Sequence, residues 1–365
     1  MAAALAAPVV RTIAPARTLA PAGRIGRLQV LRALAATMVV IFHAVSNYLP
    51  AGSAMLDFGL YELLSGGVEI FFVISGFIIR ATSWNAHGPA HAAGFLLKRF
   101  VRLVPYYWLI TSGLVLLCLA APGLFHSYHF EWRHALASML FIPWPRPDGA
   151  IYPPLAPGWS LNYEVLFYLA FAALMLFARR ERAVWWLGGL AVAGVCAGVL
   201  ADADPALFIA GNPFVLEFVA GAIFADVWRA RSGRFGPACG WVALVAGSAL
   251  VASFLVFPVP GIVYLKNAGF ACLVVAFMTL PAPAAPRWLE SGLACLGEAS
   301  YSIYLIHPIV LGPLSRVLFG APFLRENSLL LVVAITAGAL GAGLLAWRFV
   351  ETPLLALCRA RLGRV

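Results

Sequence analysis

Hydrophobic residues along this chain fall into long runs separated by short polar segments. A bilayer core about 30 Å thick needs about 20 apolar residues per spanning helix. Stretches that approach or reach this length lie at residues 28–48, 66–82, 103–121, 159–178, 184–201, 206–228, 238–257, 261–280, 296–318 and 328–350. The sixth stretch is the weakest, because Asn212, Pro213 and Glu217 interrupt it. The pattern predicts an all-α, polytopic membrane protein with about ten transmembrane helices.

The composition leads to the same class of protein. Of the 365 residues, 62% are hydrophobic and 11% are charged, whereas an ordinary globular domain carries about 25% charged residues. Too few polar side chains are present to cover a surface in water. This excludes a disordered chain, a fibrous repeat and a basic nucleic-acid-binding protein, so we expect membrane lipid and no nucleic acid as a partner.

The basic residues predict the orientation. The chain has 25 Lys and Arg against 15 Asp and Glu, a net charge of +10, and such an excess normally lies on cytoplasmic loops. If the N-terminus is inside, 19 of the 25 basic residues fall on inner segments. An even number of spans, with both termini cytoplasmic, satisfies this rule at every loop.

The membrane region accounts for nearly the whole chain. We expect a flexible cytoplasmic tail at residues 1–27, a membrane domain at 28–353 and a second cytoplasmic tail at 354–365. The first segment holds four arginines and no long apolar core, so it is not a cleavable signal peptide. The six cysteines are scattered singly, which predicts neither a disulfide framework nor a zinc site. We expect no metal site.

Two costly side chains lie in the first hydrophobic stretch. A charged group at mid-membrane costs about 2.5 to 3.5 kcal/mol on insertion scales. The presence of Arg32 and His43 in this stretch therefore needs a structural or functional explanation. Eleven residues make three helical turns plus about 20°, which places both on one face about 16 Å apart along the axis. The alternative to a functional pair is purely structural. The guanidinium of Arg32 would then extend to the membrane interface, and His43 would hydrogen-bond to a neighbouring helix.

A basic pair precedes the third stretch. Arg99 and Arg102 lie one turn apart on one helical face, and two guanidinium groups so spaced can hold a phosphate or pyrophosphate. A cluster of this kind also serves simply to face anionic lipid. In the second stretch, Ser75 and Gly76 suit a hydrogen bond across helices and a close helix approach.

Two more polar groups of residues lie in apolar stretches, one of them where the fourth stretch opens on the predicted outer side. Ser160, Glu164 and Tyr168 follow an i, i+4, i+8 spacing, and a carboxylate one turn inside an apolar helix is hard to explain structurally. Tyr304 and His307 share one side of the ninth stretch. Because a proline follows His307, this histidine can instead satisfy a backbone carbonyl freed by a kink.

Two other functional classes remain open on these residues alone. Asp202 and Asp204 match the DxD of metal-dependent sugar transferases, but a three-residue match is weak and fits a loop turn as well. A transporter or flippase for a glycolipid would also use about ten spans and a polar stripe. That class predicts two halves with matching broken helices, and the sequence has no such symmetry.

Taken in chain order, these segments resemble the acyltransferase-3 family of bacterial integral-membrane O-acyltransferases over residues 28–353. The motifs that carry the resemblance are Arg32 and His43 with ten residues between them, Phe71 to Gly76, Arg99 to Pro105, Trp159 to Tyr168 and Tyr301 to His307. Many family members have Asp-Gly ahead of the first-helix arginine, which this chain lacks. That departure, together with Asn162, resembles the exopolysaccharide O-acetyltransferase branch, which decorates polymers such as succinoglycan or xanthan.

The resemblance implies a reaction and a location. An acetyl group passes from acetyl-CoA, a donor substrate and not a bound cofactor, to a hydroxyl of a bacterial surface polysaccharide or exopolysaccharide. The acceptor is a polysaccharide or, more specifically, a lipid-linked oligosaccharide, and the protein resides in the bacterial cytoplasmic (inner) membrane.

The resemblance also distributes the roles of the residues. The groups that meet the donor are Arg32, Arg99, Arg102 and Ser75. The catalytic groups are His43, which assists the transfer as a base because histidine titrates near neutrality, together with Glu164 and His307. The groups that bind the acceptor are Trp159, Tyr163 and Tyr304.

The charge pattern gives a direct test of topology. Reporter fusions at residues 58 and 140 should read extracytoplasmic, and fusions at 90, 181 and 232 should read cytoplasmic. A cytoplasmic signal at 140 would contradict the arrangement of the first four spans.

Overall fold

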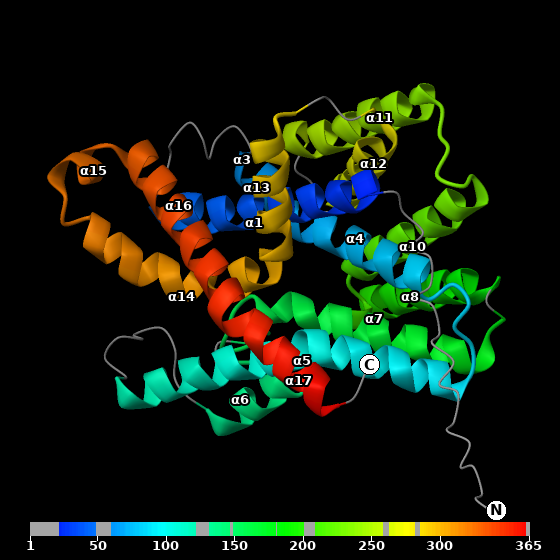
Figure 1. Cartoon of the computed structure of the whole chain (residues 1–365), viewed down its shortest axis with the longest axis horizontal. Helices are drawn as coiled ribbons and strands as arrows, with labels where there is room; N and C mark the ends of the chain where they lie inside the picture. Colours follow the sequence, from blue (N-terminus) through cyan, green and yellow to red (C-terminus); the bar gives the residue numbers. More distant parts are fainter. Residues whose placement is uncertain are drawn as a thin grey trace, which may run out of the picture.

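The computed structural model describes residues 22–48, 60–121, 131–146, 149–179, 181–200, 209–257, 263–281 and 285–362. Throughout these residues the chain forms helices joined by turns and short loops, and no strand occurs in them (Figure 1). The all-α prediction is confirmed. Residues 1–21 of the expected N-terminal tail, and the pair Asp202 and Asp204, lie outside the described residues.

The described helices, in chain order, are α1 (Ala22–Tyr48), α3 (Leu60–Ser65), α4 (Gly67–Thr82), α5 (Pro89–Ala120), α6 (Trp132–Met139), α7 (Gly158–Phe177), α8 (Ala183–Leu200), α10 (Phe214–Ala230), α11 (Pro237–Val256), α12 (Val263–Thr279), α13 (Arg287–Glu298), α14 (Ser300–Leu318), α15 (Pro322–Glu326), α16 (Ser328–Ala346) and α17 (Thr352–Arg361). A π-helical turn, η3 (Trp347–Glu351), joins the last two.

Eight helical segments of the described chain are long and apolar enough to cross a membrane. One of them is α3 together with α4, and another runs from α16 through α17. Helices α10 and α12 occupy the sixth and eighth predicted positions, but each has only 17 residues. The chain is therefore a multi-pass membrane protein, with eight spans by length where the hydrophobic pattern predicts about ten.

Several helices extend beyond their predicted boundaries into polar sequence. Helix α1 begins at Ala22 and α17 continues to Arg361, so parts of both expected tails are helical. Helix α5 begins at Pro89 and has 32 residues, about 48 Å at 1.5 Å per residue. The length of an apolar stretch limits the membrane span, but the helix itself can continue into polar sequence. Hydrophobicity alone therefore predicts helices that are too short. Arg99 and Arg102 consequently lie within α5.

Helix α4 packs closely against α10. A Cβ on Gly76 would lie 2.0 Å from the carbonyl oxygen of Phe218, and a Cβ on Gly221 would lie 2.0 Å from that of Val73. Two small residues thus let the backbones touch, as is usual between membrane helices. Arg80 on α4 forms a salt bridge with Asp226 on α10 at 2.6 Å, which connects the two helices near their C-terminal ends.

Helices α1, α7, α8 and α12 contact one or both members of this pair. Helix α1 contacts α4, α13, α14 and α16, while α5 lies along α7 and α11 forms a hairpin with α12 (Figure 1). Helix α17 returns to α5. This arrangement brings α1, α4, α5, α7 and α14, which are far apart in the sequence, around one internal space.

The contact between α4 and α10 predicts a sharp effect of one methyl group. Gly76→Ala should lower the free energy of unfolding by about 1 to 3 kcal/mol, the usual range for overpacking, because the new Cβ meets backbone and not a movable side chain. Gly189→Ala on α8 is the matched control, since no atom lies within 4 Å of a Cβ there. Thermal unfolding in detergent measures both, and equal melting temperatures would contradict the close approach.

Candidate functional site

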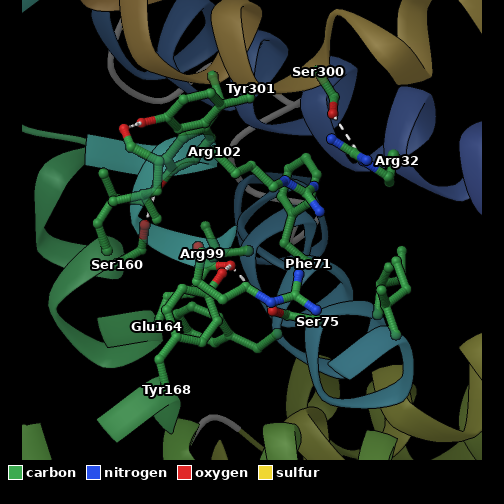
Figure 2. A pocket seen from close by; sticks show the side chains of 17 residues that line it. Arg32, Phe71, Ser75, Arg99, Arg102, Ser160, Glu164, Tyr168, Ser300 and Tyr301 are labelled. Atoms are coloured by element: carbon green, nitrogen blue, oxygen red, sulfur yellow. Dashed lines mark hydrogen bonds between the residues drawn. The ribbon is translucent and has the colours of Figure 1, made fainter. Parts of the chain in front are cut away.

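A pocket opens between five helices. It encloses about 790 Å³, its open mouth included, and side chains of α1, α4, α5, α7 and α14 line it (Figure 2). The predicted residues that line it are Arg32, Ser75, Arg99, Arg102, Glu164 and Tyr304. The fold thus joins residues from five separate sequence motifs in one cavity.

Three arginines gather on one side of this pocket. Arg32 donates from Nε to Ser300 Oγ at 3.1 Å, and Arg99 donates from Nη2 to Thr82 Oγ1 at 3.5 Å. The Nε of Arg99 is buried and has no hydrogen-bond partner in the described part of the chain. A buried donor without an acceptor is costly, so this guanidinium is suited to an anion arriving from outside.

Two carboxylates offset the arginines in part. Glu164 Oε1 accepts hydrogen bonds from Ser75 Oγ at 3.1 Å and from the hydroxyl of Tyr168. Glu351, in the π-helical turn, accepts from Ser302 Oγ at 2.5 Å. Arg32 interacts electrostatically with both carboxylates and with Arg102. Three cations facing two anions leave a net positive charge, which suits a phosphate-bearing ligand.

The other end of the pocket is neutral and polar. Ser160 and Tyr304 share a hydrogen bond of 2.7 Å. The carbonyl oxygen of Pro157 lies 3.0 Å from the Ser160 hydroxyl and 3.3 Å from the Tyr304 hydroxyl, and it accepts from the one that does not donate to the other. Ser160 and Tyr168, both in the lining, are eight residues apart on α7, about 12 Å along the helix. The pocket therefore has a cationic end and a hydroxyl-lined end.

His43 and His307 lie together just beyond the lining. The Nδ1 of His43 is 3.2 Å from Nε2 of His307, and their ring centroids are 4.8 Å apart. Tyr304 links this pair to the pocket, because its ring lines the cavity while its carbonyl lies 2.7 Å from His307 Nδ1. The ring centroids of Tyr304 and His307 are 6.1 Å apart, so one side chain lies between the cavity and the imidazoles.

The hydrogen-bond partners of these histidines assign their tautomers. The Tyr304 carbonyl can only accept, so His307 Nδ1 carries a hydrogen and its Nε2 is an acceptor. The Val39 carbonyl, 3.0 Å from His43 Nδ1, likewise requires a hydrogen there, which His43 also offers to His307. The lone pair of His43 is therefore on Nε2, where no hydrogen bond from the described residues occupies it. That nitrogen can accept a proton.

Three of the predicted site residues contact other parts of the protein in this geometry. Tyr163 is only 2% exposed and packs against Phe72, Trp159 and Phe214, which leaves no ring face for a sugar. Trp159 is half-buried in the same aromatic group and is not part of the pocket lining. Glu164 lies among the arginines, where it accepts hydrogen bonds from the hydroxyls of Ser75 and Tyr168.

Sequence reasoning did not single out two residues at the site. Ser300 accepts a hydrogen bond from Arg32, and the carboxylate of Glu351 interacts with the positive charge of Arg32. Ser300 gave no signal, because a lone serine within an apolar stretch is common. Glu351 did offer one, as a carboxylate at the end of the last apolar run, and it lies in a π-helical turn of the kind that often marks functional sites.

Comparison with known proteins decides the family. The model of the acyltransferase domain (acyltransferase-3) matches residues 25–348. The chain belongs to this acyltransferase family.

Three relatives are similar to this acyltransferase. Exopolysaccharide production protein ExoZ of Rhizobium meliloti is 37% identical over 313 residues, 82% of this chain and 92% of that protein. Nodulation protein 10 of Rhizobium leguminosarum bv. viciae is 25% identical over 377 residues, 94% and 96% of the two chains. Peptidoglycan O-acetyltransferase OatA of Listeria monocytogenes is 28% identical over 159 residues, 40% of this chain and 23% of that protein. No solved structure matches the chain.

Proposed function

We propose that this acyltransferase moves an acetyl group from acetyl-CoA to a hydroxyl of a bacterial exopolysaccharide or surface polysaccharide, at the stage of the lipid-linked saccharide, in the inner membrane. The single observation that carries the proposal is the pocket with Arg32, Arg99 and Arg102 on one side and a pair of imidazoles beyond its hydroxyl-lined end. The names of two relatives, an exopolysaccharide production protein and a peptidoglycan O-acetyltransferase, support a saccharide acceptor.

The shape of the donor supports the assignment of the arginines. Coenzyme A carries its anionic phosphates at one end and its thioester at the end of a long, flexible arm. The phosphates bind the guanidinium groups, whose planar forks suit bidentate hydrogen bonds and one of which has an unused buried donor. The arm then follows α7 toward Ser160 and Tyr304. Arg32 and His43, about 16 Å apart on one face of α1, match such an elongated ligand.

The transfer itself needs a base. The acceptor hydroxyl gives its proton to Nε2 of His43, and its oxygen attacks the thioester carbonyl. The carbon–sulfur bond then breaks, and the departing thiolate takes the proton back from His43. During the step the Nδ1 hydrogen of the imidazolium stays bonded to His307 Nε2, which keeps the ring oriented. Tyr304 and Phe71, which lie 5.8 Å apart by ring centroids at the pocket wall, must let the thioester pass.

The first experiment tests the activity and its base together. Purified protein in nanodiscs should transfer radiolabelled acetyl from acetyl-CoA to the polysaccharide or lipid-linked saccharide of a strain lacking this protein. His43→Ala should reduce the rate by about 10² to 10⁴-fold, the usual contribution of a general base, while folding and membrane insertion stay normal. His307→Ala should also lose activity, with a lower melting temperature, because His307 is fully buried.

Two outcomes would contradict these assignments separately. A wild-type protein that transfers no acetyl to either acceptor, but moves the lipid-linked saccharide across a vesicle membrane, would make it a transporter. Wild-type turnover by His43→Ala would remove His43 from the mechanism and leave His307 as the base.

A second experiment concerns the donor phosphates. Arg99→Lys and Arg102→Lys keep the positive charge but lose the planar fork, so the KM for acetyl-CoA should rise while the protein level and topology stay normal. Arg133→Lys, on the exposed side of α6, is the matched control. If all three variants match the wild type in donor dependence, Arg99 and Arg102 serve as lipid-facing anchors.

A further inference from the structure

A second, smaller cavity lies where the loop that follows α6 meets the first turn of α7. It takes in about 190 Å³ of space between atoms, its open side included. Two exposed aromatic rings form part of its wall, Trp144 at 39% and Tyr152 at 50% exposure. The cavity is thus a shallow, open site bordered by aromatic rings.

The floor of this cavity is polar. His134, Ser138 and Asn162 line it, each less than 10% exposed. His134 lies 2.7 Å from the carbonyl of Tyr152 through Nε2, and Ser138 shares a hydrogen bond of 2.6 Å with Tyr107. The amide of Asn162 is 7% exposed, and no hydrogen bond to it occurs among the described residues. An amide that is nearly buried, faces a cavity and lacks a partner needs a ligand or water to satisfy it.

The two cavities share a wall. Ser160 and Leu161 line the larger pocket, and Asn162, the next residue of α7, lines the smaller one. Tyr107 braces this turn, because its hydroxyl bonds Ser138 and a Cβ on Gly158 would lie 2.6 Å from that hydroxyl. The same segment of α7 thus lines both cavities, which places the smaller one beside the hydroxyl-lined end of the larger pocket.

We propose that this second cavity, formed by Trp144, Tyr152 and Asn162, binds a sugar ring of the acceptor next to the ring that is acylated. Aromatic side chains contact the apolar face of a sugar, while the Asn162 amide supplies both a donor and an acceptor for hydroxyl groups. This inference rests on the proposed function. It assigns acceptor binding to side chains different from Trp159 and Tyr163, which pack within the protein.

The competing explanation is an aromatic belt. Trp and Tyr are common at membrane interfaces, where they anchor a protein without binding a sugar. Trp132, the first residue of the short helix α6 that precedes this loop, is 62% exposed and is not part of the lining. It therefore serves as a matched control that shares the surroundings of Trp144 but not the cavity.

Acceptors of graded length test the proposal. Oligosaccharide fragments cut from the polysaccharide of a strain lacking this protein, and the lipid-linked saccharide of that strain, are assayed with acetyl-CoA and protein in nanodiscs. In the wild type the KM should fall once a fragment gains the adjoining ring. In Trp144→Ala and Asn162→Leu this gain should disappear, raising the KM for the longer acceptors about tenfold, while kcat and the KM for acetyl-CoA stay unchanged.

The controls separate the outcomes. Trp132→Ala should behave as the wild type with every acceptor. The sugar site is overturned if Trp144→Ala and Asn162→Leu keep the length dependence, or if Trp132→Ala loses it equally, as an aromatic belt requires. Parallel changes in kcat and in the KM for acetyl-CoA would also overturn it, since they indicate a structural role. A wild-type protein inactive on every acceptor refutes the proposed function itself, before any variant is compared.

Discussion

The cost of burying cations within a membrane bundle governs this structure. Arg32, Arg99 and Arg102 approach one another from two helices, and each lies where an isolated charge is expensive. Ser300, Thr82, Glu164 and Glu351 lower this cost by hydrogen bonds and opposite charge. These partners come from four further parts of the chain, so the arginines hold together elements that the sequence separates. The positive charge that remains gives the pocket its preference for an anion.

Helix α4 links this electrostatic centre to the rest of the fold. Ser75 faces the pocket and binds Glu164, while the next residue, Gly76, meets the backbone of α10. A polar residue and a glycine side by side thus serve two different faces of the helix, about 100° apart. Because backbone contact allows little adjustment, α10 fixes the position of α4 and, through it, the hydrogen bond that holds Glu164.

Helix α7 has a similar double role on the acceptor side. Its first turn presents Ser160 to the larger pocket and Asn162 to the smaller cavity, and Tyr304 connects Ser160 to the histidine pair. Helix α14 in turn supplies Ser300 at the cationic end and His307 beyond the neutral end. The two ends of the larger pocket are therefore held by side chains on helices, which suits a reaction that depends on position.

The sequence by itself determined the helical class, the position of most membrane segments and the polar residues that deserve attention. These follow from local rules: apolar runs form helices in lipid, and eleven residues place Arg32 and His43 on one face. Only the tertiary structure decided which side chains meet. The pairing of His43 with His307, the support of Arg32 by Ser300 and Glu351, and the burial of Tyr163 all depend on how separate helices pack. That packing is set by small residues such as Gly76 and Gly221, whose contacts lie more than 140 residues away in the chain, beyond the reach of any periodicity along one helix.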